Sequence, residues 1–405
     1  MVSLEQIGIL NFQSYSLKGK LFEREEDFVV QEIEEDGRVL GVERQKEERQ
    51  PGDKKDYLAF TLVKRGMSTP EAVKILSRSL HVSFKRIAYN GNKDKRAITS
   101  QRISIFKLDA EKLKVENERA FCTDLEYNSV PCKIGKLYGN RFTVVVREFD
   151  RAGGDLERIK REVTEGLPNF YGPQRFGSSS LNIEVSRNII KRDFKAAFYD
   201  LVLRERAESQ LNRQKREELK SVFSDYVFGK DLDRERAEES LSKLPGFMYY
   251  EKESLGYLMQ HKNDFAGAMR LMPKYTRLMI LQAYQYYVFN RTLSTFEGES
   301  APEDIPTIGY DFDLKDDAVG RAIGGILRED GIEDTGAFKI DSMPEASLKS
   351  FMHPSRFLPE NMSFEENEGK AVIKFDLKKG SYATILLMKL FGVDSLYDGR
   401  IPDRA

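Results

Sequence analysis

One acidic residue, Asp94, lies within an otherwise basic segment of the chain. Between Lys85 and Lys107 the sequence has seven basic residues and a single acid. A surface that binds a polyanion normally lacks carboxylates, because they repel phosphate. Neighbouring cations also favour the ionised carboxylate, which can act as a nucleophile or as a base. The pattern favours a chemical task for Asp94, although a surface Asp in a charged turn would show the same pattern.

The segments on either side of Asp94 indicate how it is presented. Strand-like residues occur at 86–89 and 102–106, and Asn90-Gly91-Asn92 between them is typical of a turn, because Gly and Asn tolerate positive φ. We therefore expect Asp94 on a loop held by strands, which is a common setting for a catalytic group. Thr99 and Gln101 either hydrogen-bond within this loop or face solvent.

Two phenylalanines and one loop are further candidates for RNA contact. Phe28 and Phe142 lie in strand-like segments, where they either pack in the core or stack on a nucleobase that has left its helix. The loop 169–177 contains Gln174 and Arg175 between glycines and prolines. Arg175 there either binds backbone carbonyls at a tight domain junction or contacts phosphate and sugar.

Composition bounds the class of protein. The chain has 405 residues, 40% of them hydrophobic, and its 65 basic and 66 acidic residues give a formal net charge of -1. This length predicts two domains of a folded, soluble protein, and any nucleic-acid footprint must be local because the total charge is balanced. No secretory signal or apolar run of membrane-spanning length is found, which favours a cytoplasmic location without membrane contact.

Metal ligands are sparse in the sequence. The two cysteines, Cys122 and Cys132, have no second pair, and the three histidines are widely separated, so we expect no metal and no cofactor. The acidic group Asp311 to Asp317 could suggest a divalent cation, but it lacks the Gly and distal Glu of a calcium loop. A solvated helix start is the favoured interpretation of that group.

Hydrophobic patterning predicts a strand-rich chain interrupted by helices. Strands are expected at 27–33, 57–63, 142–147 and 371–377, and helices after the capping box Ser68-Thr69-Pro70-Glu71, over 156–166 and over 382–391. Residues 186–295 are mostly helical and highly charged, with an amphipathic helix around Leu281 whose aromatic residues are expected in a core. A second domain inserted between strand-rich ends explains this order.

Six sequence blocks, in order along the chain, resemble the TruD family of tRNA pseudouridine synthases. Asn90–Gln101 is similar to the family signature GxKDxxAxTxQ, Asp27–Glu32 to DFxVxE, Gly139–Phe142 to GNxF, and Asn169–Gly177 to NxFGxQRFG, here with Tyr171; Leu281–Gln285 and Lys379–Thr384 resemble two later blocks. The resemblance extends from about residue 27 to residue 390.

The resemblance implies both a fold and a reaction. The fold is α+β, a pseudouridine synthase core with a mixed, mainly antiparallel sheet (residues 1–166 and 371–405) and a large inserted α-rich domain (167–370). The reaction breaks the bond from C1′ to N1 of an RNA uridine, turns the uracil and joins C1′ to C5, without a cofactor. The expected substrate is tRNA, modified at uridine 13, and the expected oligomeric state is a monomer.

The same resemblance assigns roles to individual residues. It makes Asp94 the catalytic group, places Phe142 against the target uracil with Asn140 nearby, and puts Phe28 in the pocket wall. The basic residues around Asp94 then hold the sugar-phosphate. The expected substrate-binding set is Phe28, Lys93, Lys95, Arg96, Gln101, Asn140, Phe142, Gln174 and Arg175.

One position departs from the family pattern. Relatives usually have Lys or Arg six positions before the motif Phe28, where this chain has Phe22. We hypothesise that Lys20 or Arg24 takes the place of that basic residue. Two rival functions also follow from the sequence: a non-catalytic RNA-binding or RNA-folding protein on the same scaffold, and a hydrolase that holds a metal with the Asp311 to Asp317 carboxylates.

Overall fold

The computed structural model describes residues 3–44, 51–113, 116–177, 180–206, 208–296 and 300–397. The chain forms two compact units, each assembled from segments that are far apart in the sequence. The sheet unit consists of residues 13–169 and 356–405, and the helical unit of residues 1–12 and 170–355. The domain division at residues 166 and 370 stays a prediction about the family's architecture.

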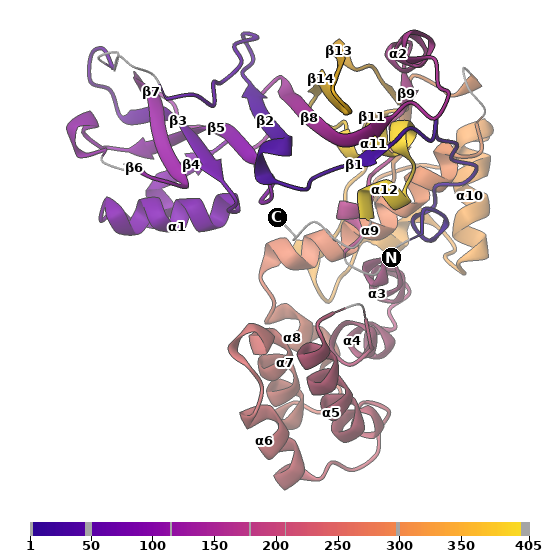
Figure 1. The fold of residues 1–405 in the computed structure, drawn as a ribbon. Helices are drawn as coiled ribbons and strands as arrows, with labels where there is room; N and C mark the ends of the chain where they lie inside the picture. Colours follow the sequence, from indigo (N-terminus) through magenta and orange to yellow (C-terminus); the bar gives the residue numbers. More distant parts are fainter. Residues whose placement is uncertain are drawn as a thin grey trace. The chain divides into compact units, whose positions relative to one another are not determined.

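A ten-stranded sheet dominates the sheet unit, with strands in the order β13-β14-β8-β2-β5-β3-β7-β6 and with β1 beside β8 and β4 beside β5 (Figure 1). The strands are β1 (Lys18–Lys20), β2 (Phe28–Ile33), β3 (Tyr57–Arg65), β4 (Ile87–Tyr89), β5 (Ile98–Phe106), β6 (Glu116–Asn117), β7 (Ala120–Asn128), β8 (Gly139–Asp150), β13 (Glu360–Asn367) and β14 (Lys370–Lys378). β2 and β5 pair in parallel, whereas β8 pairs antiparallel with β2 and with β14. The predicted α+β class with a mixed, mainly antiparallel sheet is confirmed.

Helices and short strands complete the sheet unit. They are η2 (Glu25–Asp27), α1 (Thr69–Ser79), η3 (Phe84–Arg86), η4 (Ala110–Lys112), α2 (Leu156–Thr164), α11 (Ala383–Phe391), α12 (Asp394–Tyr397) and the antiparallel pair β9 (Leu167–Pro168) and β12 (Arg356–Phe357). The strands and helices predicted from the sequence for this unit are therefore present, with ends that differ by a few residues.

Helix α1 packs on the sheet beside the segment that carries Asp94. The predicted capping box forms: Ser68 Oγ accepts a hydrogen bond from the Glu71 backbone N–H, and Glu71 Oε2 accepts one from Ser68 N–H. The helix buries Val73 and Leu76 in a core with Phe60 of β3 and with other residues of β3 and β5. In Figure 1, α1 lies below β3 and β4. This core fixes α1 against the strands that flank residues 90–97.

The helical unit contains the long helix α9 and a group of shorter helices (Figure 1). Its elements are η1 (Glu5–Ile7), η5 (Pro173–Arg175), α3 (Leu181–Ile190), α4 (Phe194–Val202), α5 (Gln210–Val227), α6 (Arg234–Ser242), η6 (Gly246–Met248), α7 (Tyr249–Gln260), α8 (Phe265–Arg270), α9 (Lys274–Leu293), β10 (Asp304–Thr307), α10 (Ala318–Glu329), η8 (Thr335–Phe338), η9 (Pro344–Ala346) and β11 (Phe351–Pro354). As predicted, α9 buries Leu281, Tyr284, Val288 and Phe289. None of the helices in the described ranges is long and apolar enough to cross a membrane.

The Gly139 position explains one residue of the GNxF block. A Cβ at this position would lie 2.0 Å from the backbone oxygen of Leu377 on β14. No real Cβ makes so close a contact, so β8 and β14 can pair here only if residue 139 is glycine.

We expect Gly139→Ala to destabilise the sheet unit by about 1–3 kcal/mol, because the added methyl group forces the two paired backbones apart. Urea denaturation followed by circular dichroism would measure the change. Gly325→Ala in α10 is the matched control, because its Cβ would meet no atom within 4 Å. Ala also has the higher helix propensity, so the control should be neutral or stabilising. Equal destabilisation of both variants would contradict the packing explanation.

Candidate active site

The candidate site lies on one face of the sheet, which we call the site face. Side chains alternate between the two faces along a strand, so residues paired across neighbouring strands share a face. Val30 pairs with Phe142 and with Thr99, and Thr99 pairs with Lys64. The residues of interest that this register places on the site face are Phe28, Glu32, Lys64, Thr99, Gln101, Asn140 and Phe142.

Asp94 lies in the loop 90–97 between β4 and β5, as predicted. Water reaches its side chain, which is exposed. Protein surrounds the carboxyl closely enough that desolvation raises its pKa above the usual value for Asp, while Lys64 and Lys93 act in the opposite direction. Asp94 is thus accessible to a substrate and depends on nearby cations for its negative charge.

Lys64 of β3 lies on the site face and binds the backbone of the Asp94 loop. Its side chain is 1% exposed, and Nζ donates hydrogen bonds to the carbonyl oxygens of Met67 (2.7 Å), Lys93 (3.3 Å) and Asp94 (2.7 Å). Burial lowers the pKa of Lys64 to about 8, although the Asp94 charge raises it. Lys64 was not predicted from the sequence to belong to the site.

Two further side chains hold the same loop through its backbone. Thr69 Oγ1 accepts a hydrogen bond from Lys93 N–H (2.9 Å) and donates one to Gln101 Oε1 (2.9 Å). The Gln101 amide in turn donates to the Gly91 carbonyl (3.0 Å). Thr69 and Gln101 are both fully buried. The Asp94 loop is therefore fixed by side chains from β3, α1 and β5.

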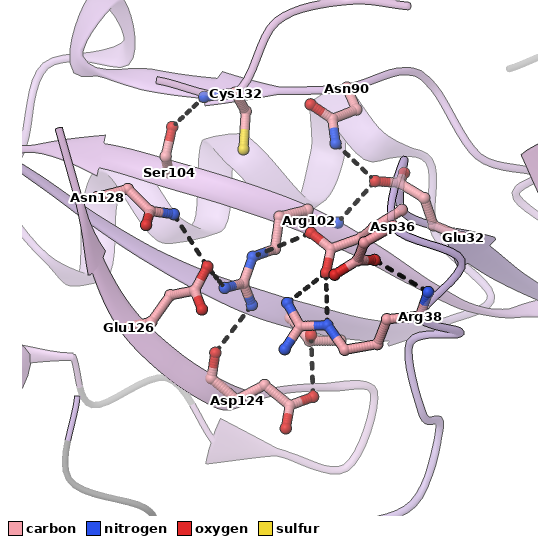
Figure 2. Close-up of polar contacts among 12 residues, drawn as sticks. Glu32, Asp36, Arg38, Asn90, Arg102, Ser104, Asp124, Glu126, Asn128 and Cys132 are labelled. Atoms are coloured by element: carbon pink, nitrogen blue, oxygen red, sulfur yellow. Dashed lines mark hydrogen bonds and ion pairs between the residues drawn. The ribbon is translucent and has the colours of Figure 1, made fainter. Parts of the chain in front are cut away.

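A buried ion pair connects the loop to β2 and β8. Lys93 Nζ lies 3.0 Å from Glu32 Oε2 and donates to Asn140 Oδ1 at 2.5 Å. The side chains of Lys93 and Glu32 are 5% and 0% exposed. The other Glu32 oxygen accepts hydrogen bonds from the Asn90 amide (2.8 Å) and from Arg102 N–H (3.3 Å), as Figure 2 shows. Glu32 therefore joins the start of the Asp94 loop, at Asn90, and its middle, at Lys93, to the sheet.

Arg102, one of the seven basic residues near Asp94, is buried within a polar cluster on the opposite face of the sheet. Its guanidinium forms ion pairs with Glu126 and with Glu34 (3.6 Å) and donates to the Asp124 carbonyl (2.8 Å) (Figure 2). Arg86 likewise donates to the backbone carbonyls of Phe106 and Lys107. Part of the predicted basic footprint thus stabilises the protein itself.

A row of aromatic rings crosses the site face. Phe142 stacks between Phe28 (ring centroids 6.0 Å apart) and Phe375 (5.2 Å), and Phe22 meets the Phe28 ring edge-on at 5.0 Å. Phe28 and Phe142 are 8% and 7% exposed. Because Phe142 is two residues from Asn140 on β8, the row runs beside the residues that hold Lys93 and Asp94.

Comparison with known proteins supplies the family. The sequence model described as tRNA pseudouridine synthase D (TruD) matches residues 7–302 and 295–390. The chain belongs to the TruD family. The matched segments include all the site residues described above.

Individual relatives agree with this assignment. The chain is 29% identical over 378 residues to "Probable tRNA pseudouridine synthase D 1" of Methanocaldococcus jannaschii, which covers 89% of this chain and 92% of that protein. It is 30% identical over 373 residues to the Methanopyrus kandleri protein named "Probable tRNA pseudouridine synthase D", covering 85% and 88%. The crystal structure of the tRNA pseudouridine synthase D homologue of Methanosarcina mazei matches with a TM-score of 0.72 at 27% identity, covering 97% of this chain and 98% of that one.

The structure brings together some of the residues that the TruD resemblance pointed to. Asp94, Lys93, Asn140 and Gln101 form one connected network, next to Phe142 and Phe28. Lys95 lies on the same loop, with its Nζ 3.7 Å from Glu71 Oε1. Arg96 is exposed. Gln174 and Arg175 are exposed in η5 of the helical unit, whereas Tyr171 and Phe176 of that block are buried.

Phe22 occupies the position of the expected basic residue, and Lys20 and Arg24 are the two candidates to replace it. Phe22 has a positive φ of 58°, which is uncommon for a bulky residue. Lys20 Nζ forms an ion pair with Glu148 at 2.5 Å. Arg24 is exposed, and its backbone N–H donates to Asp27. The hypothesis that Lys20 or Arg24 supplies the missing charge stays a proposal.

Lys64 and Glu32 were not assigned to the site from the sequence, but their positions in the strand alternation could have identified them. In Tyr57–Arg65, both faces of β3 are buried. Leu58, Phe60 and Leu62 alternate along one of these faces, and Lys64 continues the same alternation. Glu32 follows Phe28 and Val30 on β2 in the same way. A charged residue on the buried face of a strand must have polar partners, because burying it alone is costly. This reasoning would have selected both residues.

Proposed function

We propose that this chain is a tRNA pseudouridine synthase that isomerises uridine 13, with the Asp94 carboxylate attacking or deprotonating the ribose. The observation that carries the proposal is the position of Asp94: an accessible carboxylate on a loop fixed by Lys64, Thr69 and Gln101, next to the aromatic row, in a chain of the TruD family. The agreement of geometry and family supports an isomerase better than it supports a binding protein.

The site chemistry suits this reaction. The substrate base must leave its helix before the ribose C1′ is accessible. An ionised Asp94 can then attack C1′ as a nucleophile, or remove a sugar proton as a base. The N1–C1′ bond breaks, the uracil turns, and C5 bonds to C1′; C5 loses a proton and N1 gains one. Because no atoms are added or removed in total, the reaction requires no ATP or redox cofactor.

The other site residues have distinct proposed roles. Lys93 and Gln101 are buried, so we propose that they hold the loop, while the more exposed Lys95 and Arg96 contact the sugar-phosphate. Phe28 and Phe142 form the wall against which the extruded uracil stacks. Because Phe142 is only 7% exposed, stacking requires its ring or the Phe28 ring to turn. Gln174 and Arg175 are proposed as further RNA contacts from the helical unit.

A direct assay tests the proposal. The purified protein is incubated with an unmodified tRNA transcript, and pseudouridine is mapped by carbodiimide modification followed by primer extension. We expect one modified nucleotide, at position 13. A transcript with cytidine at position 13 is the control and should give no product. Absence of pseudouridine from the uridine transcript, or modification at other positions alone, would contradict the proposal.

The metal-dependent hydrolase is less well supported. The Asp317 carboxylate caps the N-terminus of α10, Asp316 forms an ion pair with Arg321 (2.8 Å), and Asp311 accepts hydrogen bonds from Ser350. The predicted helix start is found at Asp317, whereas Asp311 lies in a turn six residues earlier. Among the described residues, no group of three or more His, Cys, Asp or Glu is arranged to hold a metal ion. The RNA-binding alternative is tested by the Asp94 variant below.

A further inference from the structure

Building on the function proposed above, we infer that Lys64 is a positioning residue, whose charged ammonium group holds the Asp94 loop in the reactive conformation. Lys64 does not reach the substrate, because its side chain is 1% exposed. Its effect must therefore pass through its charge near Asp94 and through the three carbonyl groups that it binds. Two of these belong to consecutive residues of the loop, Lys93 and Asp94.

The number of acceptors matches the protonated form of lysine. An ammonium group has three N–H donors, and Lys64 Nζ meets three carbonyl oxygens. The neutral amine has only two donors, so deprotonation must release one carbonyl. It also removes the positive charge that faces Asp94. In the described part of the chain, Lys64 forms no ion pair with a carboxylate within 4.0 Å. Its charge is stabilised by these three carbonyl dipoles and, at longer range, by Asp94 and Glu71.

The Lys93 peptide shows why this matters for Asp94. Thr69 Oγ1 accepts from the Lys93 N–H, and Lys64 Nζ contacts the Lys93 carbonyl oxygen. The Lys93 side chain is held separately by Glu32 and Asn140. Residue 93 thus has contacts besides Lys64, whereas the hydrogen bond described for the Asp94 carbonyl comes from Lys64. Loss of the Lys64 charge should therefore loosen the peptide that carries the catalytic carboxylate, while the Lys93 anchor stays in place.

The ionisable groups that face Lys64 come from the Asp94 loop, from α1 and from β7. Asp94 and Lys93 face it from the loop and Glu71 from α1. The pKa of Glu71 is lowered by hydrogen bonding to Ser68, so Glu71 remains charged. Cys122 of β7 lies on the same face of the sheet, and burial raises its pKa to about 12, so it remains neutral. Burial lowers the pKa of Lys64 to about 8, so its ammonium loses charge as pH rises above neutral. Desolvation raises the pKa of Asp94, but Asp94 gains its reactive charge as pH rises, so a fall in rate at alkaline pH is assigned to Lys64.

Activity and stability should then respond to pH in opposite directions. Above pH 8 the folded protein loses the Lys64 proton, while the unfolded chain keeps it up to the ordinary lysine pKa. The unfolded state then binds more protons, so this group makes the folded state more stable as pH rises from about 8. Catalysis should instead fall over the same range, because the loop loses its charged anchor. A purely structural lysine would not separate the two measurements.

The first experiment needs no substitution. For the wild-type protein, single-turnover rates of pseudouridine formation and amide-exchange protection of residues 91–95 are measured from pH 6.5 to 9.5, together with Tm. We expect the rate and the protection to fall together with a midpoint near 8, without a matching loss of Tm. Constant protection of residues 91–95 across this range would overturn the inference. The exchange measurement tests it even if the protein formed no pseudouridine, which would contradict the proposed function instead.

The second experiment removes the charge. Lys64→Met keeps an unbranched side chain of similar length and leaves no ammonium. We expect kcat to fall roughly 10²-fold, as for a small misplacement of a catalytic group, with KM within about 3-fold and an alkaline limb that no longer depends on residue 64. Lys389→Met is the matched control. Lys389 is half-buried, and like Lys64 it has a lowered pKa and donates to a backbone carbonyl, that of Gln13. It should keep the wild-type rate.

Two further variants separate Lys64 from the basic residues predicted from the sequence. Lys20→Gln and Arg24→Gln remove the charges near Phe22. If either reproduced the loss of kcat and the altered pH profile while folded Lys64→Met retained both, the role would belong near Phe22 and the inference would be wrong. If Lys64→Met did not fold, the wild-type exchange and rate profiles would decide the question alone.

Discussion

Asp94→Asn is expected to abolish pseudouridine formation while leaving the fold and tRNA binding intact. An amide cannot act as the nucleophile or the base, so the single-turnover rate should fall by about 10³-fold or more. Stability should not decrease, because desolvation by the surrounding protein raises the Asp94 pKa, which means that the folded protein holds the ionised form at a cost. The neutral amide removes that cost, and Tm should be unchanged or slightly higher.

The measurements are tRNA affinity, Tm and the rate of isomerisation for the same preparations. Asp313→Asn, an exposed acid of the helical unit in the predicted Asp311 to Asp317 group, is the control and should keep full activity. Pseudouridine formation by Asp94→Asn would show that Asp94 is not the catalytic group. An inactive wild-type protein that binds tRNA as tightly as the variant would instead favour the RNA-binding alternative.

Glu32→Gln should cause a large loss of stability together with a loss of activity. The change breaks the ion pair with Lys93, whose side chain is only 5% exposed, and leaves that ammonium with Asn140 as its polar partner. Removing one member of a buried ion pair typically costs about 3–5 kcal/mol, because the remaining charge is uncompensated. Chemical denaturation monitored by circular dichroism would measure the free energy of unfolding.

A double variant and a surface control make this test specific. In Glu32→Gln with Lys93→Met, no charge is left unpaired, so much of the stability should return. Glu239→Gln removes the partner of Lys243 in an exposed ion pair, and its effect should be too small to measure because solvent already screens that pair. If Glu32→Gln were as stable as Glu239→Gln, the ion pair would not anchor the Asp94 loop.

The sequence was sufficient for the parts of this molecule that depend on local pattern. The capping box at Ser68, the amphipathic face of α9 and the alternation in Phe28–Ile33 depend on neighbours a few residues away, and the predicted elements are present. The Asn90-Gly91-Asn92 turn also placed Asp94 on a loop between strands. These features follow from side-chain periodicity and backbone preference alone.

Other features depend on contacts between distant segments and could not be predicted in the same way. Lys64 approaches Asp94 only because β3 and β5 are neighbours, and the sequence does not show which strands pair. Phe142 was expected to stack on uracil or to lie in a core, but its contact with Phe375 requires β14 to be placed beside β8. The basic residues near Asp94 could be counted, but the partners of Lys93 lie on β2 and β8, and Arg102 has partners on β7.

The pairing of β8 with β14 has a consequence for how the protein is made. β8 ends at Asp150, and β14 is complete only at Lys378, 228 residues later in the chain. At a synthesis rate of about 5–20 residues per second, one edge of β8 remains without its partner strand for about 10 to 45 s. An unpaired edge is a surface on which other chains can add a strand. The nascent chain should therefore be most prone to aggregate, and most dependent on chaperones, while the helical unit is being synthesised.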